Sequence, residues 1–166
     1  MTENECYILI GKLSSKFSNL EFGLSSILEH LINNTNPGIA AIITKNMQIS
    51  KVIELLTKIL NFNYEDDVEH VVEMKKLLNE IQGLRQKRNM FIHGNWWFQE
   101  EELEKDIVTC IDTRLKSSKN GKELSRMEEI KYSKHEMEAD ESKLSKLVYE
   151  VYSTGKKFGL TNLRTD

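Results

Sequence analysis

The chain has 166 residues, of which 39% are hydrophobic and 30% are charged, with one proline and eight glycines. This composition is typical of a folded, helix-rich globular protein and argues against a disordered or fibrous chain. The formal net charge of −3 argues against nucleic-acid binding through overall charge, so any such site has to be a local basic patch.

The length predicts one domain that spans residues 1–166. No stretch reaches the roughly 18 consecutive apolar residues of a membrane span, and the N-terminus lacks the basic start and cleavage site of a signal peptide. We therefore expect a cytoplasmic protein without a membrane partner. The two cysteines, Cys6 and Cys110, belong to no CxxC motif, and we expect both to be reduced and buried.

Apolar residues at alternating spacings of three and four predict the helices. This spacing runs from Cys6 to Leu31 without a break and indicates a long first helix. A cluster of Asn, Pro and Gly then marks a turn, with Pro37 suited to the first position of the next helix. Ser133 and Glu136 resemble a capping box at the start of the last helix. Helices are expected at residues 4–33, 37–44, 47–61, 66–93 and 134–158.

The pattern changes period after Gly94, which we expect to end the preceding helix in the left-handed conformation. Short aromatic or β-branched runs, separated by polar segments, predict a small antiparallel meander. The basic loop between the last two runs contains Asn120 and Gly121, a hairpin-turn signal. Strands are expected at residues 95–99, 106–113 and 127–132. The predicted fold class is mainly α, a helical bundle with a small antiparallel sheet inserted before the C-terminal helix.

Two arginines interrupt the apolar seam of the helix expected over residues 66–93. Arg85 and Arg88 stand at seam positions where an apolar side chain would normally point into a core. An unpaired buried guanidinium is costly, so the seam either opens into a cleft that holds an anion or the charges are satisfied otherwise. In the second case the arginines reach solvent at the helix end or pair with a carboxylate such as Glu21.

The geometry around His93 raises a further question. Asn89 and His93 are four residues apart and share a helix face with Arg85. Arg88 lies about 140° around the helix from His93, at about 100° per residue. On one regular helix the two side chains therefore diverge. Either the helix unwinds near Gly94, or two copies of the helix meet in a dimer and pool their residues.

A cluster of arginine, asparagine and histidine is suited to cleaving RNA without a metal. Histidine can take the proton of a ribose 2′-hydroxyl or protonate the leaving 5′-oxygen near neutral pH. Arginine can neutralise the charge that builds on the phosphorane oxygens, and asparagine can orient either group. A lone histidine near a helix end is usually a structural residue.

Residues 88–93, RNMFIH, resemble the Arg-x4-6-His motif of the HEPN superfamily (higher eukaryotes and prokaryotes nucleotide-binding), with Asn89 at the polar position that commonly follows the arginine. The segments FSNLEFGLSSIL and IITKNMQISKVIELLTKI resemble the first two HEPN helices. RNMFIHGNWW resembles a bacterial subgroup that continues HGxW into strands. The resemblance covers roughly residues 14–97.

The resemblance implies a four- or five-helix bundle that dimerises through the motif helices and forms a composite, metal-independent ribonuclease site. Arg88 and His93 would be the catalytic pair and Asn89 the supporting polar residue, with Arg85 and Glu21 as further supporting candidates. It implies an RNA substrate, a homodimer and no cofactor. Many members act as toxins or in phage defence, which implies an antitoxin or defence partner protein, and others are inactive scaffolds.

Two alternatives to the enzyme remain open at this point. The first is a non-catalytic dimeric module that holds a partner protein or nucleotide through the same polar residues. The second is a purely structural bundle in which Arg88 forms a salt bridge with Glu21.

Other residues are weaker candidates for RNA contacts. A solvated hairpin is the simpler interpretation of the basic loop, although its charges could hold phosphates. Neighbouring strand residues face opposite sides, so one of the two adjacent tryptophans should pack inside and only the other could stack on a base. His30, His70 and His135 have no partner at metal-ligand spacing, and no metal site is predicted. The candidate RNA contacts are Lys87, Trp96, Lys116, Lys119 and Lys122, with Arg114 in the same loop.

Overall fold

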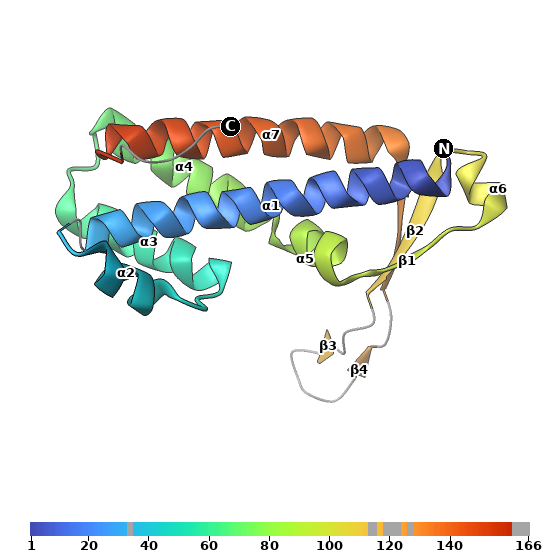
Figure 1. The fold of residues 1–166 in the computed structure, drawn as a ribbon, viewed down its shortest axis with the longest axis horizontal. Coiled ribbons are helices and arrows are strands. Elements are labelled where there is room, and N and C mark those ends of the chain that lie inside the picture. Colours follow the sequence, from blue (N-terminus) through green and yellow to red (C-terminus); the bar gives the residue numbers. More distant parts are fainter. Residues whose placement is uncertain (33–34, 113–115, 118–123, 126–127, 161–166) are drawn as a thin grey trace. The chain divides into compact units, whose positions relative to one another are not determined.

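The computed structural model describes residues 1–32, 35–112, 116–117, 124–125 and 128–160 (Figure 1). The described part is mainly helical with a small antiparallel sheet, as predicted. No helix in these ranges combines the length and the apolar composition that crossing a membrane requires. The helices are α1 (Glu3–Ile32), α2 (Pro37–Thr44), α3 (Ile49–Asn63), α4 (Glu69–Gly83), α5 (Arg85–His93), α6 (Glu100–Leu103) and α7 (Lys134–Lys157). The strands are β1 (Asn95–Trp97), β2 (Ile107–Asp112), β3 (Lys116–Ser117), β4 (Leu124–Ser125) and β5 (Glu128–Ser133).

The chain divides into two compact units. The first unit comprises Met1–Ser15 and Arg85–Lys143, and the second comprises Lys16–Leu84 and Leu144–Asp166. The long helices α1 and α7 are each divided between the two units. The expectation of a single domain stays a prediction.

The second unit is built from helices whose apolar faces meet in a core. α1 and α7 approach closely there, since a Cβ added at Gly23 would lie 3.0 Å from Val151 Cγ1. The predicted turn before α2 is confirmed, with Pro37 in the first turn and the Asn36 side chain accepting a hydrogen bond from the Ile39 N–H at 3.4 Å. Buried side chains of this core include Leu20, Leu24, Ile27, Leu28, Leu56, Leu60, Met74, Leu78, Leu147 and Val151.

The prediction of one helix over residues 66–93 is wrong. α4 begins only at Glu69 and ends at Gly83, and α5 begins at Arg85. At the break the Leu84 N–H bonds to the Ile81 carbonyl at 3.1 Å, a bond one residue shorter than the α-helical one. Glycine is the poorest helix former after proline, which explains why α4 ends at Gly83. The motif residues therefore belong to a short helix of their own.

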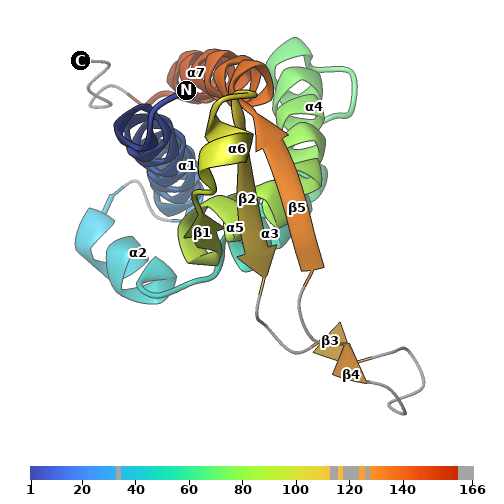
Figure 2. The same ribbon diagram turned by 90° about the vertical axis from the view of Figure 1, so that its right-hand side faces the viewer.

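The first unit contains the predicted meander, and the three-stranded antiparallel sheet is confirmed with the order β1-β2-β5 (Figure 2). Strand pairing places Trp96, Cys110 and Ile130 in one row across the sheet, on its inner face. The neighbouring row on the outer face contains Trp97, Thr109 and Lys131. Two features were not predicted: the short helix α6 after β1, and a second, two-stranded pairing of β3 with β4.

Capping boxes begin the two long helices α1 and α7. The predicted box at α7 is confirmed: the Ser133 N–H donates to Glu136 Oε2 at 2.8 Å, and the Glu136 N–H donates to Ser133 Oγ at 3.2 Å. α1 has an equivalent box, in which the Thr2 N–H donates to Glu5 Oε2 at 2.7 Å. Lys134 Nζ lies 3.0 Å from Glu5 Oε1 and so links the two helix starts.

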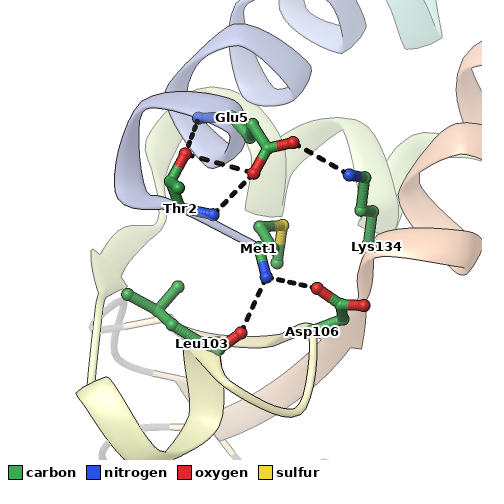
Figure 3. Close-up of polar contacts among 6 residues, drawn as sticks. All are labelled: Met1, Thr2, Glu5, Leu103, Asp106 and Lys134. Carbon is green, nitrogen blue, oxygen red and sulfur yellow. Dashed lines mark hydrogen bonds and ion pairs between the residues drawn. The ribbon is translucent and has the colours of Figure 1, made fainter.

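The same region holds the first residue of the chain. The Met1 amino group donates to the Leu103 carbonyl at 2.9 Å and forms an ion pair with Asp106 (Figure 3). Asp106 itself has a positive φ of 58°, at the turn between α6 and β2. Its carbonyl accepts from the Lys134 N–H at 2.8 Å. Hydrogen bonds and ion pairs thus join the start of α1, the α6–β2 turn and the start of α7.

We expect Glu5→Gln to change the acid stability of the protein. The Thr2 N–H, and after it Lys134, hold the pKa of the Glu5 carboxyl at about 2, below its ordinary value of 4.5. Because the folded-state pKa is the lower one, this stabilisation is present above pH 4.5 and is lost as the pH falls towards 2. The urea midpoint of Glu5→Gln should therefore fall less steeply between pH 5 and pH 2.5. Glu101→Gln, at an exposed position of α6, is the matched control and should follow the wild type.

Candidate functional site

The motif residues lie on α5, and their side chains are in contact within one chain. Arg88 Nη1 donates to Asn89 Oδ1 at 3.1 Å and lies 3.5 Å from His93 Nε2. The second distance is at the long end for a hydrogen bond. His93 is exposed, whereas Arg88 and Asn89 are half-buried. The three residues predicted to form the site are thus brought together by the structure.

The prediction that Arg88 and His93 diverge on one helix is wrong. α5 remains helical to His93, so no unwinding near Gly94 is needed. The long arginine side chain instead runs across the helix surface, past Asn89, and ends beside the imidazole. The angle of about 140° describes the Cα–Cβ directions and does not account for the reach of a guanidinium on a flexible stem. One argument for a shared site therefore does not hold.

The opposite side of α5 is fixed in the core of the first unit. Met90 and Phe91 are buried, and the Phe91 ring stacks on Trp96 with centroids 5.4 Å apart. Tyr132 of β5 completes this aromatic cluster at 5.2 Å from Phe91. Cys110 Sγ of β2 donates to the Met90 carbonyl at 3.6 Å. Because buried aromatic rings resist rotation of the helix, this packing fixes which face of α5 presents the motif.

Gly94 follows the motif helix, but for a different reason than predicted. Its φ is not in the left-handed region, so the expected left-handed stop is wrong. A Cβ at this position would lie 2.2 Å from Cys110 Sγ and 2.5 Å from the Met90 carbonyl oxygen. Glycine is required because β2 passes directly over the helix end. β1 begins one residue later, at Asn95.

The two tryptophans behave as strand alternation requires, one packed and one exposed. Trp96 was the candidate RNA contact, yet its ring packs on Phe91 and lies 5.8 Å from Tyr132. The Trp96 Nε1 is buried without a hydrogen-bond partner. Trp97 instead faces outward and is 56% exposed. A base could stack on Trp97 more readily than on the half-buried Trp96, and the assignment of Trp96 as an RNA contact stays a prediction.

We expect leucine substitutions to separate these two roles. Trp96→Leu should lower the free energy of unfolding by about 1 kcal/mol, since it removes the ring contacts with Phe91 and Tyr132. Trp97→Leu should change it by less than about 0.5 kcal/mol, as is usual for exposed positions. Chemical denaturation of both variants checks this order, and equal losses would contradict the different burial of the two rings.

Lys87, another candidate RNA contact, is held by an acidic partner. Its Nζ lies 2.8 and 2.7 Å from the two carboxylate oxygens of Asp140 on α7, and Asp140 is only 14% exposed. The charge of Lys87 is thus already balanced within the first unit. This ion pair ties α5 to α7 and makes Lys87 a poor phosphate contact.

The roles of the remaining candidates stay predictions. Arg85 is the first residue of α5 and is half-buried. Glu21 belongs to α1 within the second unit, so its supporting role stays a prediction. Lys116 lies in β3, and no side chain is described there. Arg114, Lys119 and Lys122, together with the Asn120 and Gly121 turn, lie outside the described residues.

Three features that shape the site were not predicted from the sequence. These are Asp140, which pairs with Lys87; Cys110, which packs over Gly94; and the exposure of Trp97 in place of Trp96. An acidic residue on a distant helix carries no signal of its partner in one sequence. Both cysteines are buried and neither forms a disulfide, as predicted. Within the described ranges, no group of three His, Cys, Asp or Glu side chains is arranged to hold a metal ion.

Comparisons of the chain with known protein families, with curated proteins and with solved structures each find no match. The chemistry of the site therefore has to be argued from its own residues.

Proposed function

We propose that this protein is a metal-independent RNA endonuclease, in which Arg88 and His93 act on the scissile phosphodiester and Asn89 positions the arginine. The contact within α5 supports this most directly: Arg88 Nη1 lies 3.5 Å from His93 Nε2 and 3.1 Å from Asn89 Oδ1. A cation and a proton acceptor beside each other at an exposed helix end match the two needs of RNA transesterification.

The chemistry assigns one task to each residue. His93 takes the proton from the ribose 2′-hydroxyl, and the resulting oxygen attacks the adjacent phosphorus. Arg88 donates hydrogen bonds to the phosphorane oxygens, on which negative charge builds. A bound phosphate would draw the guanidinium away from His93 Nε2 and leave that nitrogen open to the hydroxyl. Asn89, which accepts from Arg88, limits how far the guanidinium can move.

A second proton transfer completes the reaction. The bond from phosphorus to the 5′-oxygen breaks as this oxygen receives a proton, which leaves a 2′,3′-cyclic phosphate and a 5′-hydroxyl. One histidine cannot be base and acid in the same step, so a second proton donor is needed. We propose that His93 of a second copy supplies it, which retains the homodimer although one chain already pairs Arg88 with His93. A toxin or defence role, with an antitoxin or other partner protein, rests on the HEPN resemblance alone.

Incubation of purified protein with mixed RNA in EDTA tests the activity itself. We expect endonucleolytic cleavage that persists in the chelator. Cleavage that requires an added divalent metal would contradict the proposal. Absence of cleavage, combined with loss of dimerisation or partner binding in the motif variants, would favour the non-catalytic dimeric module.

Subunit mixing tests whether the site is shared. An inactive double variant, Arg88→Ala with His93→Ala, is added in increasing excess to wild-type protein and allowed to exchange. A composite site predicts that cleavage per wild-type chain falls as mixed dimers replace wild-type dimers. Constant cleavage per wild-type chain would show that one chain is sufficient.

A further inference from the structure

The outer edge of β5 is an unpaired strand edge. β5 pairs with β2 over its six residues, and in the described part of the chain no other strand pairs with it (Figure 2). Nor does any described segment outside the sheet form a backbone hydrogen bond with residues 129–131. The outward N–H and C=O groups of such an edge are a template for another strand.

Side chains along this edge are self-complementary. Glu129 and Lys131 are exposed and lie on the outer face, and Ile130 lies between them on the inner face. A strand that runs antiparallel to β5 would complement these three residues with the order acidic, apolar, basic. Residues 129–131 of β5 have this same order, Glu-Ile-Lys. We propose that β5 pairs antiparallel with β5 of a second copy, with Ile130 of one copy opposite Ile130 of the other.

The charges select this register over its neighbours. In an antiparallel pair, two residues directly opposite each other point to the same face of the sheet. The inner faces of both copies therefore lie on one side of the joined sheet only when the centre of the self-pair is a residue opposite its own copy. Centring on Glu129 or on Lys131 would place two like charges directly opposite each other. Centring on Ile130 joins residues 128–132 of both copies and places Glu129 of each copy opposite Lys131 of the other. Opposite charges stabilise such pairs and like charges destabilise them.

A hollow adjoins the inner face of β5. A pocket of about 280 Å³ lies between β5 and α5, lined by Met90, Ile130 and Tyr132 with Lys87 and Glu136 among its polar walls. The inner-face isoleucine of a second strand would lie next to Ile130, at this pocket. On α5 the pocket is lined by Gln86, Lys87 and Met90, and neither Arg88 nor His93 is among its lining residues. The proposed β5 pairing therefore uses neither of the two motif side chains.

Lys131 would take part in two ion pairs in this arrangement. Its Nζ already lies 2.7 Å from Glu102 Oε1 on the outer face, and Glu129 of the second copy would add a second carboxylate. A pairing of five residues buries little surface, so we expect a weak, concentration-dependent association rather than an obligate dimer.

Charge exchange between positions 129 and 131 tests the proposal. Glu129→Lys and Lys131→Glu, each alone, place like charges opposite each other in the self-pair. Each should therefore dissociate at roughly tenfold or more higher concentration than the wild type in sedimentation equilibrium. An equimolar mixture of the two variants restores both opposite-charge pairs and should associate as the wild type does. The double variant, Glu129→Lys with Lys131→Glu, should also recover.

The test compares the association of the variants with one another. Association through the motif helices does not involve the charges at positions 129 and 131, so it contributes equally to every variant. Wild-type protein that shows no self-association beyond that of both single variants would overturn the proposal. So would single variants that weaken association but fail to recover it on mixing. If Lys131→Glu fails to fold because the new carboxylate faces Glu102, the two single variants Lys131→Gln and Glu129→Gln are used instead. Each of them must then weaken association.

Discussion

His93→Ala is expected to lower the rate of RNA cleavage by roughly 10²–10⁴-fold, the usual contribution of a positioned general acid or base. Arg88→Ala should lower it by roughly 10²–10³-fold, since it removes a donor to the charged transition state. Neither side chain lies in a core, because His93 is exposed and Arg88 half-buried at the surface of α5. The melting temperature should therefore change little. Initial rates with a labelled RNA in EDTA, alongside thermal denaturation, provide the measurement.

The controls separate the site from the rest of the surface. His135→Ala removes another exposed histidine of the first unit, on α7, and should leave the rate unchanged. Arg88→Lys keeps the charge but loses the planar fork, and should recover only part of the activity. Equal losses in His93→Ala and His135→Ala would point to a general effect of charge. Full activity in both motif variants would remove the basis for the proposed mechanism.

Gly94→Ala is expected to lower the free energy of unfolding by about 3 kcal/mol, at the upper end of overpacking effects. The added Cβ would lie 2.2 Å from Cys110 Sγ and 2.5 Å from the Met90 carbonyl oxygen, and the second of these is a backbone atom that cannot rotate away. The helix end and β2 would have to move apart, which would displace His93. Chemical denaturation measures the loss, and cleavage should fall with it.

Two further variants show whether the close approach is the cause. Gly11→Ala adds the same methyl group in the middle of α1, where nothing lies within 4 Å, and should be neutral or stabilising by up to about 1 kcal/mol. Gly94→Ala with Cys110→Ala removes the sulfur contact but keeps the carbonyl contact. Its loss should be smaller than the sum of the single losses. Unchanged stability in Gly94→Ala would contradict the packing of β2 over the helix end.

Much of the fold could be predicted because it depends on local patterns. The three/four spacing of apolar residues located α1, α3 and α7 within a few residues, and the change to short β-branched runs located the meander. The capping box at Ser133 and the turn before Pro37 were predicted from residues that act on their immediate neighbours. These are interactions that a single stretch of sequence contains in full.

The errors come from features that depend on three-dimensional neighbours or on side-chain reach. The apolar spacing continues across Gly83 and Leu84, so it could not reveal that α4 and α5 are separate helices. Gly94 is fixed by Cys110, sixteen residues further along the chain and paired with Trp96 in the sheet. The contact of Arg88 with His93 depends on the rotamer of a long side chain, which a helical angle does not describe.

The chemical ends of the RNA products test the central claim most directly. Wild-type protein and His93→Ala, purified in the same way, are incubated with one RNA in EDTA, and the products are identified by mass spectrometry. Attack by the 2′-hydroxyl predicts 2′,3′-cyclic phosphate and 5′-hydroxyl ends with the wild type and none with the variant. Products with 3′-hydroxyl and 5′-phosphate ends, or cyclic ends formed equally by His93→Ala, would contradict the assignment of Arg88 and His93 as a ribonuclease pair.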